Sequence, residues 1–154
     1  MKRINRNILV FVTLMAVFNF QITPFSTAAT KREGSCGVTI GDAHYSTDMM
    51  RDGVRAVKIN VYSKCTQSLR SVTVYVELYK EGMFGPHLVR KTSKFYTFVK
   101  PGEKAWNKNT FDYCKNFTKT WYYGVAHSVA LINGQRSVVP QVWSSKPIQL
   151  DCGT

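Results

Sequence analysis

The residues best suited to chemistry in this 154-residue chain are basic and aromatic side chains that are mixed between residues 80 and 119. This segment carries nine lysines and arginines against three acidic residues, which leaves a net charge of +6. Cationic side chains bind phosphates, while aromatic rings stack on flat or ring-shaped ligands. The residues expected to bind an anionic ligand are Arg90, Lys91, Lys94, Lys100, Lys104, Lys108 and Trp106. The alternative is that the aromatic residues fill a β core and that the lysines protect sheet edges.

A second candidate surface is the outward face of the strand expected over residues 72–78. Alternation along this strand places Thr73, Tyr75, Glu77 and Tyr79 opposite its aliphatic residues. Tyrosines are enriched at protein interfaces, so Tyr75 and Tyr79 are candidate protein-contact residues. They could equally fill a half-buried sheet face.

The three histidines offer the best test of an enzymatic function, because a general base near neutral pH is most often histidine. His44 lies near two carboxylates in sequence, Asp42 and Asp48, whereas His87 and His127 are isolated. We interpret His44 as a solvated loop residue. The chain contains no nucleophile elbow, zinc-protease motif, phosphate loop or EF-hand. We therefore expect a protein that is not an enzyme, with no catalytic residue, no metal site and no cofactor.

Four cysteines, Cys36, Cys65, Cys114 and Cys152, predict two disulfides in an oxidising compartment. Their spacing contains no CxxC pair, which argues against a metal site. Seven alternating strands would place Cys36 and Cys65 at one end of the domain and the other two cysteines at the opposite end. This count favours the pairs Cys36 with Cys65 and Cys114 with Cys152. Six strands would leave Cys65 with Cys114 and Cys36 with Cys152 open.

The first 29 residues have the composition of a cleavable secretory signal peptide. Basic residues precede an apolar run over residues 8–20, and a proline and small residues follow it. We expect cleavage after Ala29 or one residue earlier, a short mobile tail over residues 30–35 and a single domain over residues 36–154. The signal holds three of the 21 basic residues and none of the nine acidic ones, so the secreted form keeps a charge of +9. Such a charge favours anionic partners.

Period-two alternation predicts an all-β domain. Val57–Val61 and Val72–Leu78 are the clearest strands, and their aliphatic faces should be core. Further strands are expected over residues 37–42, 88–99, 105–112, 121–132 and 137–150. Asn133-Gly134 is a preferred two-residue hairpin turn, and Pro140 and Pro147 indicate an edge or bulged strand. We predict an immunoglobulin-like antiparallel β-sandwich of six to seven strands, with a small closed β-barrel as the alternative.

The spacing of the cysteines and of a Trp/Tyr-Gly strand resembles that of small secreted immunoglobulin-like proteins of Gram-positive bacteria. The residues that carry the resemblance are Cys36, Cys65, Cys114, Trp121, Gly124 and Cys152. It implies a fold and a secreted location, and it transfers no active site.

These observations predict a secreted, non-enzymatic binding protein with a basic and aromatic surface. Its expected partner is an anionic cell-wall or cell-surface polymer, or a protein. The alternative is a secreted toxin or an inhibitor of an extracellular hydrolase. We do not expect nucleic acid as a partner. We also do not expect stable membrane insertion, because no amphipathic helix remains after cleavage.

Overall fold

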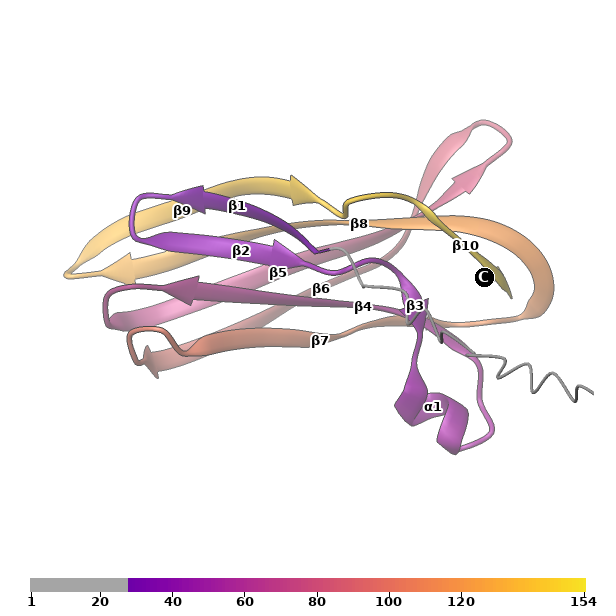
Figure 1. The fold of residues 1–154 in the computed structure, drawn as a ribbon, viewed down its shortest axis with the longest axis horizontal. Helices are drawn as coiled ribbons and strands as arrows, with labels where there is room; N and C mark the ends of the chain where they lie inside the picture. The colour runs from indigo at the N-terminus through magenta and orange to yellow at the C-terminus, as the bar shows by residue number, and fades with distance from the viewer. Residues whose placement is uncertain (1–27) are drawn as a thin grey trace, which may run out of the picture.

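A computed structural model describes residues 28–154 and shows an all-β protein of two antiparallel sheets (Figure 1). The signal peptide predicted over residues 1–29 lies outside the described residues, apart from its last two positions. The two sheets pack face to face and are not closed into a barrel. The part of the chain that the structure describes contains no helix that is long and apolar enough to cross a membrane.

Sheet A is built around a central strand, β4. Its strands are β1 (Ala29–Glu33), β2 (Cys36–Ile40), β3 (His44–Tyr45), β4 (Ala56–Cys65) and β7 (Lys104–Tyr113). One edge of β4 pairs with β2 and β3 in succession, and the other edge pairs with β7. The short helix α1 (Thr47–Arg51) connects β3 to β4, and the Ser46 side chain caps its first turn.

Sheet B contains the longest strands of the molecule. They are β5 (Leu69–Gly82), β6 (Gly85–Val99), β8 (Asn116–Ile132), β9 (Gln135–Trp143) and β10 (Ile148–Gly153). The order is β6-β5-β8, and the far edge of β8 pairs with β10 along its first half and with β9 along its second half.

The core forms where the inward faces of the two sheets meet. The aliphatic faces of β4 and β5 are at most 1% exposed, which confirms the predicted core residues Val57, Ile59, Val61, Val72, Val74, Val76 and Leu78. Gly124 of β8 is part of this contact, because a Cβ atom there would lie 2.1 Å from the Ile59 Cδ1 atom and 2.9 Å from that of Ile40. The glycine therefore allows the two sheets to pack closely at this point.

The number of strands differs from the prediction. The structure has ten strands instead of six or seven. Residues 30–35, which the sequence analysis treats as a tail, form most of β1 and the turn to β2, because β1 pairs with β2 along its whole length. The segment over residues 137–150 is two strands, separated by a loop that contains Pro147. The two-residue strand β3 and the helix α1 are too short to give a periodic signal.

The structure confirms the Asn133-Gly134 turn and the bulged edge strand expected at Pro140, whereas Pro147 lies in the loop between β9 and β10. Asn133 and Gly134 have φ values of 48° and 80°, as a type I′ hairpin requires. Val139 pairs with Ser128 and Val142 with Ala126, so β9 carries one extra residue around Pro140. This bulge lies on a strand at the edge of sheet B, where a missing N–H group is tolerated.

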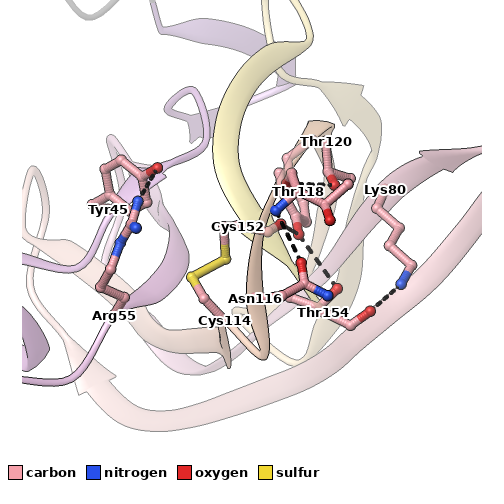
Figure 2. The surroundings of a disulfide bond; sticks show 10 residues. Tyr45, Arg55, Lys80, Cys114, Asn116, Thr118, Thr120, Cys152 and Thr154 are labelled. Carbon is pink, nitrogen blue, oxygen red and sulfur yellow. Dashed lines mark hydrogen bonds between the residues drawn. A yellow bond between two sulfur atoms is a disulfide. The ribbon is translucent and has the colours of Figure 1, made fainter.

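Two disulfides, Cys36–Cys65 and Cys114–Cys152, confirm the pairing that the seven-strand count favours. The first joins paired residues of β2 and β4. Figure 2 shows the second, which ties β10 to the turn between β7 and β8. The Tyr122 hydroxyl donates a hydrogen bond to the Cys152 carbonyl oxygen, and the Lys80 ammonium donates one to the carbonyl oxygen of Thr154. The C-terminal strand is therefore held by side chains as well as by its ladder.

Candidate anion-binding groove

The outward face of sheet A gathers cationic and aromatic side chains from strands that are far apart in sequence. Because the odd-numbered residues of β4 from Val57 to Cys65 point into the core, Tyr62 and Lys64 point outward. The register pairs Tyr62 with Trp106 and Lys64 with Lys104. Two adjacent strands thus place two aromatic rings and two lysines on one surface.

Four side chains on this face are in contact. The Tyr62 and Trp106 ring centroids lie 4.7 Å apart with a tilt of 57°. The Lys104 Nζ atom is 4.4 Å from the Tyr62 centroid and 5.6 Å from that of Trp106, and the Lys108 Nζ atom is 4.8 Å from the Trp106 centroid. These cation–π contacts hold two ammonium groups over the rings at a modest energy, about 0.5–1 kcal/mol each at an exposed site.

The face is hollowed beside the aromatic pair. A hollow of about 340 Å³ is lined by Arg32 of β1, by Lys64 and Lys104, and by the hydroxyl-bearing residues Thr30 and Thr39. The two threonine hydroxyls are hydrogen bonded to each other at 2.9 Å. None of the described residues that line this hollow carries a carboxylate.

A second hollow of about 230 Å³ continues the first. Thr39 and Tyr62 line both hollows, so the two hollows are neighbours on the outward face of sheet A. The second hollow is also lined by Asp42, His44 and Asn60. We refer to both hollows, with the basic and aromatic residues that border them, as the cationic groove. Those residues are Arg32, Tyr62, Lys64, Lys104, Trp106 and Lys108.

The second hollow offers hydrogen-bonding groups. The His44 Nδ1 atom lies 2.9 Å from the Asp42 carbonyl oxygen, and its Nε2 atom lies 3.3 Å from the Asn60 Nδ2 atom. Within residues 28–154, the Asn60 Oδ1 atom is the one buried side-chain nitrogen or oxygen atom without a hydrogen-bond partner. A buried oxygen without a donor is unusual in a native structure. It could accept a hydrogen bond from a ligand hydroxyl or ammonium group.

Charge in the cationic groove is not neutralised within the protein. Among the described residues, the ion pairs involve two acidic residues, Asp48 and Glu77, and neither pairs with a lysine or arginine of the groove. The Asp42 carboxylate in the second hollow accepts a hydrogen bond of 2.8 Å from the Ser145 hydroxyl. The first hollow therefore attracts anions, while the second combines the Asp42 carboxylate with the polar side chains of His44 and Asn60.

The structure brings together three of the predicted anion-binding residues, Lys104, Trp106 and Lys108, all of which lie on β7. Arg90, Lys91 and Lys94 lie on β6, and Lys100 lies in the turn that follows. Because β6 belongs to sheet B and β7 to sheet A, the basic segment is divided between two sheets.

The β6 lysines already have partners on sheet B. Lys91 forms an ion pair of 2.6 Å with Glu77, and the Lys94 Nζ atom lies 5.2 Å from the Tyr96 centroid. Sequence proximity thus grouped residues that the fold separates.

Sequence reasoning missed Arg32, Tyr62 and Lys64. A signal was available for two of them, since the alternation that starts at Val57 also places Tyr62 and Lys64 on the face opposite the core. Arg32 gave no such signal. Its position depends on the pairing of β1 with β2, across which Arg32 lies opposite Gly37.

The predicted protein-contact residues, Tyr75 and Tyr79, do lie on the outward face of sheet B, but both are partly covered. Tyr75 stacks on His127 with centroids 4.6 Å apart, and Tyr79 stacks on Tyr123 at 5.3 Å. Tyr123 in turn stacks on Trp143 at 5.6 Å. The ring faces therefore contact one another more than solvent, and they tie together β5, β8 and β9.

Polar groups in this aromatic row perturb one another. Hydrogen bonds from Lys91 and Tyr79 hold the pKa of the Glu77 carboxyl below its ordinary value. The same hydrogen bond to Glu77 raises the pKa of the Tyr79 phenol to about 12. Burial lowers the pKa of His127 and raises that of Tyr123. These shifts follow from packing and from one ion pair.

The histidines do not form an acid–base arrangement in the described residues. Asp48, one of the carboxylates near His44 in sequence, instead pairs with Arg51 at 2.7 Å. His87 lies beside Gly82 in the β5–β6 hairpin, and His127 is stacked on Tyr75. No group of three or more potential metal ligands occurs within residues 28–154.

Comparison with known proteins found no matching family model, no significantly similar curated protein and no significantly similar solved structure.

Proposed function

We propose that this protein is an extracellular, non-enzymatic binding module whose cationic groove holds an anionic polymer of the cell surface. One observation carries the proposal. Lys104 lies over both Tyr62 and Trp106 at the border of a hollow that also receives Arg32 and Lys64 and has no carboxylate in its lining. Such a site combines charge for a phosphate or carboxylate with ring surface for a sugar.

The shape of the groove favours an extended ligand. It runs from β1 across β2 and β4 to β7, and the distance between these outer two strands is about 14 Å at the usual spacing of strands. One part is basic, and the other offers His44 and the unpaired Asn60 oxygen. A polymer that alternates charged groups with hydroxyl-bearing rings would match both parts in one repeat.

The location is part of the proposal. Two disulfides suggest an oxidising environment outside the cytoplasm, in agreement with the signal peptide expected from the sequence. An immunoglobulin-like identity has support from topology, because two antiparallel sheets pack face to face and the chain passes from one sheet to the other between β4 and β5. In this proposal the chain resembles the small secreted proteins of Gram-positive bacteria in compartment as well as in fold.

The experiment is sedimentation of residues 28–154 with isolated Gram-positive cell walls, before and after removal of their anionic polymers, across a salt series. These residues contain both disulfides and the core between the two sheets. The test variant is Lys64→Gln/Lys104→Gln. The matched control, Arg136→Gln/Lys146→Gln, removes the same charge from exposed positions on β9 and in the loop after it.

We expect binding to disappear when the anionic polymers are removed and to weaken with salt. The groove variant should bind about tenfold more weakly at low salt, and its dependence on log salt should be shallower by about two anion contacts. Trp106→Ala should weaken binding and leave the salt dependence unchanged, because it removes ring surface and no charge. Equal binding by the groove variant and its control would contradict the proposal.

A further inference from the structure

The tip of the β5–β6 hairpin exposes two apolar side chains that the proposed groove does not use. Met83 is 92% exposed and Phe84 is 93% exposed. They form the two-residue loop between the paired residues Gly82 and Gly85. Pairing of β5 with β8 ends at Lys80, so the last residues of the hairpin extend beyond the sheet, where Figure 1 shows it projecting from the body of the molecule.

The turn itself does not require these residues. Tight hairpin turns favour Asn, Asp and Gly, and the other two-residue hairpins in residues 28–154 use Gly34-Ser35 and Asn133-Gly134. Gly85, with a φ of 109°, already supplies the unusual backbone conformation at the tip. Neither Met83 nor Phe84 belongs to the core. Their exposure therefore points to a contact with something outside this chain.

The hairpin is built to present its tip in a defined position. A Cβ atom at Gly82 would lie 2.4 Å from the His87 ring, so the glycine lets the imidazole pack directly on the backbone. Ladder pairing continues to Gly82 and Gly85, the last residues before the loop. Insertion of the two side chains would thus cost little conformational entropy.

Exposed apolar side chains are concentrated at this end of the sandwich. Met50 of α1, Val54 in the loop after it, Leu88 near the start of β6, and Tyr113 and Phe117 on either side of the β7–β8 turn are also exposed at this end. The turns at the opposite end are polar or glycine-rich over residues 34–35, 66–68, 100–103 and 133–134. Several separate apolar protrusions fit a deformable apolar phase better than they fit one pocket of a protein.

Basic residues at this end of the sandwich also favour binding to a membrane. Lys115 and Lys119 lie on or next to the β7–β8 turn, and Arg55 lies 4.6 Å from the Phe117 ring centroid. Basic residues near apolar ones favour an anionic lipid surface.

We infer that the β5–β6 hairpin docks this protein reversibly on an anionic lipid bilayer by inserting Met83 and Phe84 into the interfacial region. The lysines of the β7–β8 turn contribute attraction to lipid phosphates. This contact is shallow and does not cross the bilayer, so it is compatible with a protein that has no stable membrane insertion. It is also independent of the cationic groove, which lies on the outward face of sheet A.

The test is sedimentation of residues 28–154 with large unilamellar vesicles of phosphatidylcholine, with and without about one third phosphatidylglycerol. The variant is Met83→Ser/Phe84→Ser, which removes no core contact because both side chains are more than 90% exposed. The matched control is Phe95→Ser/Phe98→Ser, which removes two other exposed phenyl groups, 62% and 80% exposed, from β6. A thermal melt of each variant verifies folding.

We expect the wild type and the control to bind the anionic vesicles, and the tip variant to bind them at least tenfold more weakly. Phe84→Trp should bind more tightly and should add blue-shifted fluorescence when vesicles are present, because tryptophan favours the interface. The tip variant should still bind cell walls like the wild type, which separates this inference from the proposed groove. Equal vesicle binding by tip variant and wild type, or no vesicle binding by the wild type, would overturn the inference. Equal binding to neutral and anionic vesicles would overturn the choice of an anionic surface.

Discussion

At the scale of single residues, the chemistry of this protein depends on which charges are already paired. Lys91 is held by Glu77, whereas Lys104 contacts the rings of Tyr62 and Trp106 and has no carboxylate partner. Two lysines of the same basic segment therefore have different roles. Lys91 stabilises sheet B, and Lys104 is available for an external anion.

The Glu77 carboxylate should make stability depend on pH in the acidic range. Its pKa is lowered by hydrogen bonds from Lys91 and Tyr79, so the folded state holds the Glu77 proton less tightly than the unfolded state does. Its stabilising contribution is complete above the ordinary carboxyl pKa and is lost as pH falls through the lowered value. We expect Glu77→Gln to reduce the free energy of unfolding by about 1 kcal/mol at pH 7 and by less at pH 3.

The measurement is the urea midpoint of wild type and Glu77→Gln between pH 7 and pH 3. His127, whose pKa is lowered by burial and raised by the neighbouring Glu77 charge, also destabilises the fold in acid. The difference between the two curves therefore reports Glu77 together with its coupling to His127. Curves that remain parallel over the whole range would show that the carboxylate contributes nothing.

At the scale of the elements, the position of β10 depends on a crosslink. The strand is six residues long and pairs with the first half of β8 at the edge of sheet B. Cys152 is fully buried and is bonded to Cys114 at the end of β7. The disulfide therefore joins the edge of one sheet to the last residues of a strand in the other (Figure 2).

Removal of this disulfide should release β10 before the rest of the domain unfolds. In Cys114→Ser/Cys152→Ser we expect a loss of about 2–4 kcal/mol and new protease cleavage in the loop over residues 144–147. Mass spectrometry of a limited subtilisin digest reads out the missing C-terminal peptide. Cys36→Ser/Cys65→Ser is the matched variant, since it should lose similar stability without cleavage at that loop. The same cleavage pattern in both variants would refute a local role for the second bond.

At the scale of the whole molecule, the two proposed contacts use different parts of the sandwich. The cationic groove lies across the strands of sheet A, and the apolar tip extends from the hairpin of sheet B. Neither binding mode requires contact between the groove and the tip. A molecule on a lipid surface would leave the groove free for a polymer.

This arrangement predicts independent effects when the two sets of substitutions are combined. Lys64→Gln/Lys104→Gln should reduce wall binding alone, and Met83→Ser/Phe84→Ser should reduce vesicle binding alone. The fourfold variant should show both losses, each equal to that of its parent. Wall and vesicle sedimentation of all four proteins provides the measurement. A groove variant that also loses vesicle binding would show that one surface serves both ligands.

Much of the fold could be predicted from the sequence because it depends on local alternation and local turns. Local sequence is enough to predict the aliphatic faces of β4 and β5 and the Asn133-Gly134 turn. The observed disulfide pairing is the one that a count of seven strands favoured, although the structure has ten strands in the described residues. By contrast, β1 pairs with the adjacent strand β2 and β3 pairs with β4, but the sequences of β1 and β3 contain no clear alternation of apolar residues.

The candidate site could be predicted only in part, for a physical reason that β7 illustrates. The sequence by itself determined the residue types, since Lys104, Trp106 and Lys108 lie within five positions of one another on one strand. Only the tertiary structure decided that β6 and β7 separate into different sheets and that Tyr62, Lys64 and Arg32 join the groove. The face to which a side chain points follows from the alternation along its own strand, which is a local property. Which residues of adjacent strands lie side by side follows from the register, which depends on the packing of the whole chain.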